Sequence, residues 1–198
     1  KENNIIPDAI WFDSAEIDEH SQQSQPIAQK IKTIRNKFGF DNVLYFGGVA
    51  FKYQAKVRSF TTFFPINCPI SFKFLGSNST LADATGIAAK FVDVVTTSGT
   101  NAYNTILVNG YISGPGTGIA ADLEKIKLMS ESVRALKSRL AIASGISSEN
   151  IGQFLPFIDL YLVSTSISIN FHELDESKVR ALALIMAKYE VDDVENND

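Results

Sequence analysis

The stretch from Arg139 to Thr165 reads RLAIASGISSENIGQFLPFIDLYLVST, and the prediction of the fold rests on its pattern. It begins with an apolar run that ends in the pair Ser144-Gly145. A segment with helical character follows over Ser147–Leu155, and a second apolar run ends in Ser164-Thr165. Both runs are apolar at consecutive positions, which is typical of strands buried on both faces. Strands of this kind that alternate with helices predict a parallel sheet covered by helices.

The same alternation recurs about five times along the chain. The helical segments carry apolar residues three and four positions apart, as Ile27, Ile31, Ile34 and Phe38 do. Gly47-Gly48 interrupt one strand and indicate a bulge or a close approach of the backbone. The expected strands are Asp8–Asp13, Asn42–Phe51, Phe91–Thr97, Arg139–Ala143 and Asp159–Thr165, and the expected helices are Gln25–Phe38, Leu81–Lys90, Ile119–Leu136, Ser147–Leu155 and Asp175–Tyr189.

One segment departs from the alternation. Asn101–Ser113 reads NAYNTILVNGYIS, with Asn109-Gly110 placed between two short apolar runs. Asn-Gly between such runs is the signal of a tight β-hairpin turn. We therefore expect an inserted β-hairpin within the long loop from Ser98 to Gly116.

The composition is that of one globular domain, with 198 residues, 45% of them hydrophobic and 20% charged. We expect a single domain over 1–189 and an acidic tail over 190–198. The apolar runs are far shorter than the roughly 20 residues that span a bilayer, so no membrane span is predicted. A single cysteine, Cys68, cannot form an internal disulfide, which favours a reducing, cytoplasmic location.

The charge argues against nucleic-acid binding. The net charge is −4, but five of the 22 acids follow Lys188, so the rest of the chain holds 17 acids against 18 bases. Nine aromatic residues and four bases, without any acid, fall in Asn42–Ala82. A nucleic-acid platform also combines bases and aromatics, but it belongs to a basic domain, and the pI here is about 5.2. Core or interface packing is the better interpretation of these aromatics.

Small and hydroxyl residues gather where the expected strands end. Ligands of parallel α/β folds lie at this carboxyl edge, and free backbone N–H groups there favour anions, phosphate in particular. Turns after strands also use Gly and Ser, which is the alternative explanation. The candidate phosphate-binding residues are Ser98, Gly99, Gly116, Thr117, Gly118, Ser144, Gly145, Ser164 and Thr165.

Candidate acid–base groups are few. Asp13 and Lys52 lie at or just after strand ends, where a barrel keeps its catalytic groups. A desolvated lysine there binds an anion or forms a Schiff base, although Lys52 also fits an exposed loop lysine. Asp93 and Asp159 begin strands at the opposite edge, where a structural role is expected.

No cofactor or metal site is predicted. The chain lacks the Walker, GxGxxG, CxxC, HExxH and GxSxG motifs. Its two histidines, His20 and His172, do not have the spacing of metal ligands.

These motifs carry a family resemblance. Phe91–Gly99 (FVDVVTTSG), Gly116–Gly118 (GTG), Ala141–Asn150 (AIASGISSEN) and Asp159–Ser166 (DLYLVSTS) resemble the last strands of the BtpA/SgcQ family. Lys52 in VAFKYQ is similar to that family's strand-end lysine, with Tyr53 in place of the usual histidine.

The resemblance implies a (β/α)₈ barrel related to the ribulose-phosphate-binding barrels. Such barrels commonly hold a phosphate between the loops after the seventh and eighth strands, which correspond here to Ser144-Gly145 and Ser164-Thr165. Asp13 falls where the family's preceding strand ends. The five expected strands correspond to the fourth to eighth, so the first three are missing. Family members are linked to photosystem I assembly or to sugar operons, so the resemblance supplies no substrate.

Two hypotheses about function follow, and they leave open whether the chain is an enzyme. In the first, a BtpA-like barrel binds, and in one version transforms, a small phosphorylated metabolite such as a sugar or nucleoside phosphate. Lys52 and Asp13 would then be its reactive groups. In the second, the same fold is a non-catalytic assembly or scaffold protein, and the aromatic-rich stretch faces a second copy or another protein.

Overall fold

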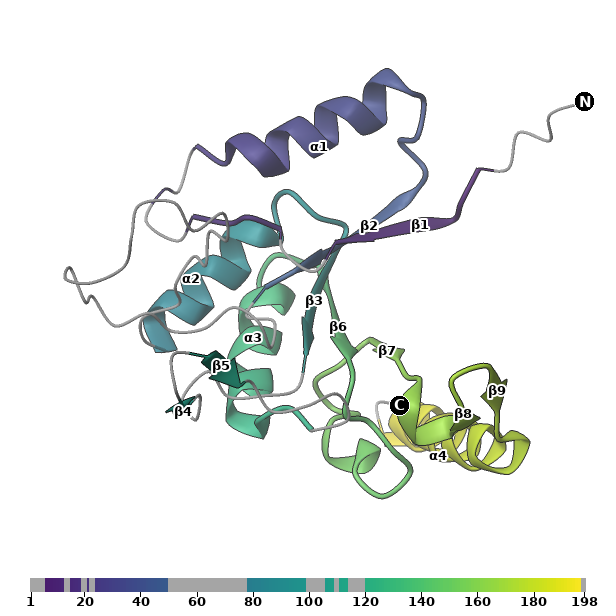
Figure 1. Ribbon diagram of the computed structural model, residues 1–198. Coiled ribbons are helices and arrows are strands. Elements are labelled where there is room, and N and C mark those ends of the chain that lie inside the picture. The colour runs from purple at the N-terminus through teal and green to yellow at the C-terminus, as the bar shows by residue number, and fades with distance from the viewer. Residues whose placement is uncertain are drawn as a thin grey trace, which may run out of the picture.

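The fold is known from a computed structural model, drawn in Figure 1. The structure describes residues 6–12, 15–18, 21, 24–49, 78–98, 106–108, 111–113 and 120–196. Five parallel strands form its main sheet in the order β1-β2-β3-β6-β7. They are β1 (Ala9–Phe12), β2 (Leu44–Gly48), β3 (Val94–Ser98), β6 (Arg139–Ala143) and β7 (Leu160–Leu162).

The strand order identifies the type of α/β fold. Neighbours in the sheet follow one another along the chain, apart from the inserted β4 and β5, and every pair is parallel. Crossover connections between parallel strands are right-handed, so sequential strands place their helices on one face of the sheet. A barrel is wound in this way, whereas a doubly wound sheet reverses its strand order. The predicted fold class, an incomplete (β/α)₈ type with about five units, is confirmed.

The helices lie near their expected positions. They are α1 (Pro26–Lys37), α2 (Asn78–Ala88), α3 (Leu123–Arg134) and α4 (Glu176–Asn196). Pro26 occupies the first turn of α1, where its missing N–H costs nothing. α4 continues beyond residue 189 into the acidic segment. Within the described residues, no helix is long and apolar enough to cross a membrane.

The helix-covered face of the sheet holds the main core. Tyr45, Val95 and Leu140 point to this face and pack with buried residues of α2 and α3. Gly47 also lies on this face, and a Cβ added there would lie 2.5 Å from Cγ1 of Val92. The Gly47-Gly48 pair therefore marks a close approach of the backbone, one of the two options that the sequence left open.

The other face of the sheet carries a smaller apolar cluster. Phe46, Val94 and Ala141 are buried there, with Leu160 and Leu162 half-buried beside them. In a closed barrel this face would point into the interior.

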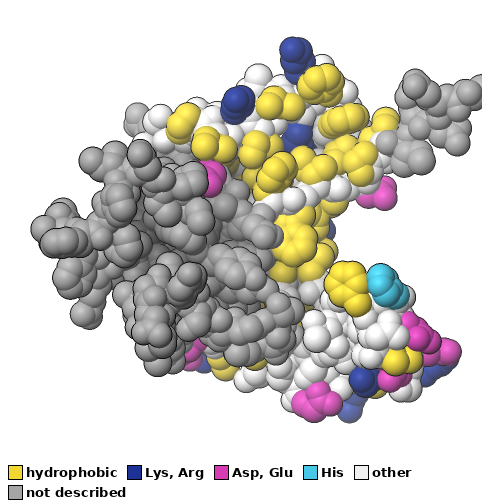
Figure 2. Space-filling model, in the orientation of Figure 1, with side chains coloured by type: hydrophobic (Ala, Val, Ile, Leu, Met, Phe, Trp, Pro, Cys, Tyr) yellow, Lys and Arg dark blue, Asp and Glu magenta, His cyan; other side chains and the backbone are white. Residues whose placement is uncertain are grey.

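Most of the apolar stripe that predicts α1 is exposed, and only its member Ile31 packs against the main core. Ile27, Ile34 and Phe38 are 44–63% exposed, whereas Ala28 and Arg35 are buried. Figure 2 shows hydrophobic side chains gathered over α1 and the adjoining strands. The periodicity correctly predicted a helix, but the apolar spacing alone does not show which side of α1 is buried.

The helix expected over Ser147–Leu155 is a second correction. Only a single 3-10 turn, η2 (Ile151–Gln153), forms in this segment. One turn does close, because the Ile151 N–H donates to the Ser147 carbonyl at 3.0 Å, but no α-helix continues from it. The Asn150 side chain accepts a hydrogen bond from the Ser147 N–H (2.9 Å) and donates one to the Gly145 carbonyl (2.7 Å), which holds this turn against the loop after β6. Ser147 is therefore not the N-cap of an α-helix.

Two hairpins stand outside the main sheet. β4 (Ile106–Val108) and β5 (Tyr111–Ser113) pair antiparallel as a separate two-stranded sheet, which confirms the inserted hairpin. A second hairpin, β8 (Ser168–Asn170) with β9 (Glu173–Leu174), precedes α4 and was not predicted.

Asp93 and Asp159 have the structural role expected of them. Each lies just before a strand, and its carboxylate accepts a hydrogen bond from the backbone of the preceding strand. Asp93 Oδ2 accepts from the Tyr45 N–H at 2.7 Å, and Asp159 Oδ2 accepts from the Leu140 N–H at 2.8 Å. The N–H of each aspartate also donates to the carbonyl of the same partner residue. The two carboxylates thus extend the strand ladders at the amino edge of the sheet.

Candidate functional site at the carboxyl edge of the sheet

The fold brings together the predicted site residues that the structure describes. Ser98 ends β3 and pairs in register with Ala143 of β6, which in turn pairs with Leu162 of β7. Ser144-Gly145 follows directly after β6, and Ser164-Thr165 follows β7 after one intervening residue. The remaining candidates lie outside the described residues, and they are Asp13, Lys52, Gly99, Gly116, Thr117 and Gly118.

The loop after β6 turns sharply at Ser144 and Gly145. Their φ angles are 78° and 75°, so both adopt the left-handed conformation. Glycine takes this conformation freely, whereas a residue with a Cβ pays about 1–2 kcal/mol for it. The Ser144 N–H still donates to the Leu162 carbonyl at 3.3 Å, so the turn begins against β7. Such strain at a strand end is common at ligand sites.

The loop after β7 packs directly against the loop after β6. Ser164 leads into a short 3-10 turn, η3 (Thr165–Ile167). Within that turn the Ser166 hydroxyl donates to the Ile146 carbonyl of the other loop. The Ser164 carbonyl accepts hydrogen bonds from the Ile167 N–H and from the Ser168 hydroxyl, both at 3.0 Å. These bonds hold the two loops as one unit.

Backbone donors remain available in this unit. Counting only the described residues, the N–H groups of Gly145, Ser164 and Thr165 make no hydrogen bond. Gly145 is half-buried, and Ser164 and Thr165 are exposed, so an incoming group can reach them. Several free N–H groups from adjacent loops favour an anion with more than one oxygen.

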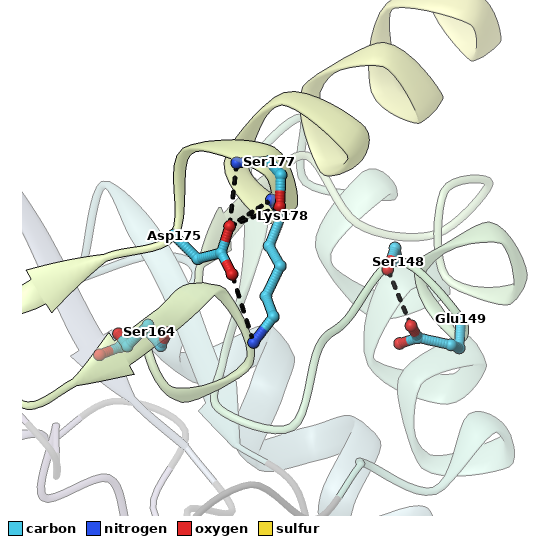
Figure 3. A network of polar contacts seen from close by, with 7 residues as sticks. Ser148, Glu149, Ser164, Asp175, Ser177 and Lys178 are labelled. Carbon is cyan, nitrogen blue, oxygen red and sulfur yellow. Dashed lines mark hydrogen bonds and ion pairs between the residues drawn. The ribbon is translucent and has the colours of Figure 1, made fainter.

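The charged side chains nearby are paired with one another (Figure 3). Asp175 caps α4, because its Oδ1 accepts from the N–H groups of Ser177 and Lys178 at 3.0 and 3.2 Å. The Lys178 ammonium lies 3.8 Å from Asp175 Oδ2. The hydrogen bond from the Ser177 hydroxyl is the largest cause that lowers the pKa of Asp175. Asp175 therefore occupies the positive end of α4, and a ligand anion must depend on the loop N–H groups.

Glu149 adds a second carboxylate to the loop after β6. It is exposed, and the Ser148 hydroxyl donates to it at 3.0 Å. Hydrogen bonds, with that of the Ser147 hydroxyl as the largest cause, lower the pKa of Glu149. Asp175, Glu149 and Lys178 together give this neighbourhood no excess of positive charge.

One buried cation at this edge was missed by the sequence analysis. Lys125, in the first turn of α3, is 7% exposed, and its Nζ donates to the Ser98 carbonyl at 3.0 Å. Burial lowers its pKa to about 7, against the opposing effect of Asp122. The signal was present in the helical periodicity, because Lys125 shares a face with the buried Met129 and Val133.

Across the part of the chain that the structure describes, no three His, Cys, Asp or Glu side chains are grouped so that they could hold a metal ion.

Comparisons with known proteins add no argument about the fold or the site. No known protein family and no curated protein matches the chain. A solved structure to which it is similar is the crystal structure of phosphoribosyl anthranilate isomerase from Thermus thermophilus. The two are 14% identical, the match covers 82% of this chain and 68% of that one, and the TM-score is 0.39. The fold assignment therefore rests on the strand order of the chain itself.

Proposed function

We propose that the chain binds a small phosphorylated metabolite, such as a sugar or nucleoside phosphate, at the carboxyl edge of its sheet. One observation carries the proposal: the loops after β6 and β7 are bonded to each other, and both carry N–H groups that make no hydrogen bond with the described residues. Those groups belong to Gly145, Ser164 and Thr165.

Phosphate suits this arrangement better than a carboxylate does. It presents three terminal oxygens, and two loops at an angle can donate to different oxygens of one phosphate. The hydroxyls of Ser164 and Thr165 add exposed donors. The same two loops are those that the BtpA/SgcQ resemblance assigns to phosphate, and membership of that family stays a prediction.

A phosphate titration followed by ¹H–¹⁵N NMR tests the proposal on single amides. We expect inorganic phosphate and ribose 5-phosphate to move the amide signals of Gly145, Ser164 and Thr165 together, with one saturation curve. Ribose without phosphate should leave them in place. Shifts spread over the exposed lysines, or no shift at these three amides, would contradict the proposal.

A matched pair of variants separates charge from backbone geometry. Gly145→Asn and Gly145→Asp impose the same side-chain size and the same strain at a φ of 75°. Only the aspartate places a negative charge beside the anion, where one pair of unit charges about 4 Å apart is worth up to ~4 kcal/mol. We expect Gly145→Asp to bind ribose 5-phosphate at least about 100-fold more weakly than Gly145→Asn, or roughly 2.7 kcal/mol. Equal affinities in two folded variants would argue against the site.

The scaffold hypothesis has one observation in its favour. Trp11 and Phe12 in β1 are 47% and 50% exposed, and Phe38 at the end of α1 is 63% exposed. Large apolar side chains that a fold leaves exposed are candidates for protein contacts. Sedimentation of Phe12→Ser and Phe38→Ser variants tests this candidate, because loss of a higher oligomer would favour it and an unchanged monomer would oppose it.

A further inference from the structure

A buried lysine lies beside the proposed phosphate-binding loops. Lys125 lies in the first turn of α3. Its side chain reaches Ser98, the last residue of β3, and Nζ donates to the Ser98 carbonyl at 3.0 Å. The residue is 7% exposed, which is unusual for lysine. Its amine therefore lies at the carboxyl edge of the sheet and not on the outer surface of the helix.

The sheet register fixes where this amine lies relative to the loops. Ser98 pairs with Ala143, the residue before Ser144-Gly145, and Ala143 pairs with Leu162, two residues before Ser164. Neighbouring strands are about 4.8 Å apart, so the two loops lie one and two strand spacings away. These spacings amount to roughly 5 and 10 Å, distances that a short carbon chain can bridge. A ligand held by its phosphate can therefore direct its other end toward Lys125.

Burial makes the neutral amine of Lys125 accessible near neutral pH. Burial lowers the pKa of Lys125 to about 7, although Asp122, the N-cap of α3, acts in the opposite direction. An ordinary lysine has a pKa near 10.4 and holds almost no free amine at neutral pH. A desolvated lysine with a free lone pair is a nucleophile toward carbonyl groups.

We propose that Lys125 is a carbonyl-reactive amine that forms a Schiff base with a phosphorylated aldehyde or ketone. The inference rests on the proposed function, because the loops supply the phosphate site that delivers the carbonyl. The Nζ lone pair attacks the carbonyl carbon, and the carbon–oxygen π electrons move to oxygen, which takes a proton. Nζ gives up one proton as the carbinolamine forms. A second proton, taken from solvent, lets that oxygen leave as water, and the nitrogen lone pair forms the protonated imine between Nζ and the ligand carbon. The substrate class is thus a small oxo compound with a phosphate at its other end.

Pyridoxal 5′-phosphate is a suitable probe, because it carries an aldehyde and a phosphate. The full-length chain is treated with it, sodium borohydride is added as reductant to fix the imine as a secondary amine, and the modified lysines are identified by peptide mass spectrometry. We expect Lys125 to be modified at least about 10-fold faster than Lys127, the exposed lysine of the same helix. Pyridoxal without phosphate should lose this preference, and inorganic phosphate should compete with the probe.

Binding and reaction are measured separately, so that each failure has its own meaning. Pyridoxine 5′-phosphate, which has an alcohol in place of the aldehyde, reports binding alone in the NMR titration above. If it binds at Gly145 and Ser164 while Lys125 stays unmodified, the Schiff-base inference is wrong and the phosphate site stands. If it does not bind, both proposals fail.

Variants provide a second measurement. Lys125→Met removes the amine and keeps an unbranched side chain in the buried position, and Lys127→Met is its control on the surface. We expect Lys125→Met to abolish the rapid phase of modification and to retain pyridoxine 5′-phosphate binding within about 3-fold. A rapid phase that survives in Lys125→Met would overturn the inference. If Lys125→Met does not fold, the position of the label on the natural chain decides alone.

Discussion

Removing the Asp93 carboxylate tests how the amino edge of the sheet is held together. Its Oδ2 accepts the Tyr45 N–H at 2.7 Å and lies 2.9 Å from Arg35 Nη1. The Arg35 side chain is 10% exposed, and that of Asp93 is 40% exposed. In Asp93→Ala the Tyr45 N–H loses its acceptor and Arg35 loses its counter-charge.

The two losses set the expected magnitude. An unpaired buried N–H costs about 1–3 kcal/mol. Removing one partner of a fully buried ion pair costs about 3–5 kcal/mol, but Asp93 is partly exposed and Arg35 keeps the carbonyls of Val43 and Asp41 as acceptors. We therefore expect loss of the ion pair to lower the free energy of unfolding by about 1 kcal/mol, a value close to that of a solvent-exposed ion pair. Asp93→Ala should lower the free energy of unfolding by about 2–4 kcal/mol.

Urea denaturation of three variants provides the assay. Asp93→Asn keeps an oxygen for the Tyr45 N–H and loses only the charge, so we expect its free energy of unfolding to fall by about 1 kcal/mol. Asp159→Ala loses an equivalent acceptor, that of the Leu140 N–H, and in the described residues no guanidinium lies within ion-pair distance of Asp159. Asp83→Ala changes an exposed aspartate of α2 and should stay within about 0.5 kcal/mol of the natural chain. If Asp93→Ala is no less stable than Asp83→Ala, the reasoning about the strand-start aspartates is refuted.

Three further predictions concern other parts of the fold. Gly47→Ala places a Cβ 2.5 Å from Val92 Cγ1, so it should lower the free energy of unfolding in urea by about 1–3 kcal/mol. An unchanged denaturation midpoint would mean that the strand can shift to accommodate the methyl group. The folded-state pKa of Lys125 is about 7, below the ordinary value for lysine. Between about pH 7 and pH 10, Lys125 is therefore protonated in the unfolded chain and largely neutral in the native state. Stability should therefore rise with pH across that window despite Asp122, and Lys125→Met should remove this rise when the two chains are compared at pH 7 and pH 9. Replacing 101–113 by two glycines should change Tm by less than about 4 °C, because among the described strands β4 and β5 pair only with each other; loss of the cooperative transition would show that the hairpin is needed.

Local features of the fold could be predicted because their causes are local. Consecutive apolar residues in Arg139–Ala143 require burial on both faces, and this requirement predicted a parallel strand with the observed bounds. Asn109-Gly110 predicted a hairpin because few other dipeptides adopt its turn without strain. The aspartates before β3 and β7 were assigned to the structural edge from their place in the pattern alone.

Other features depend on contacts that no local pattern contains. Ile27, Ile34 and Phe38 predicted a helix correctly, yet which side of α1 is buried depends on the neighbours that the sheet supplies. The segment after β6 has helical character, but only one turn and η2 form there, and the local pattern does not show where such a segment stops.

The candidate site divides in the same way. The sequence by itself determined that Ser144-Gly145 and Ser164-Thr165 follow parallel strands, because strand ends and turn residues are encoded within a few positions. Only the tertiary structure decided that Ser166 joins the two loops and that the Lys125 amine reaches Ser98. Both contacts bridge about 20 residues or more of sequence, and their formation depends on sheet register and on how α3 packs. Periodicity describes one element at a time, whereas a site is formed where several elements meet.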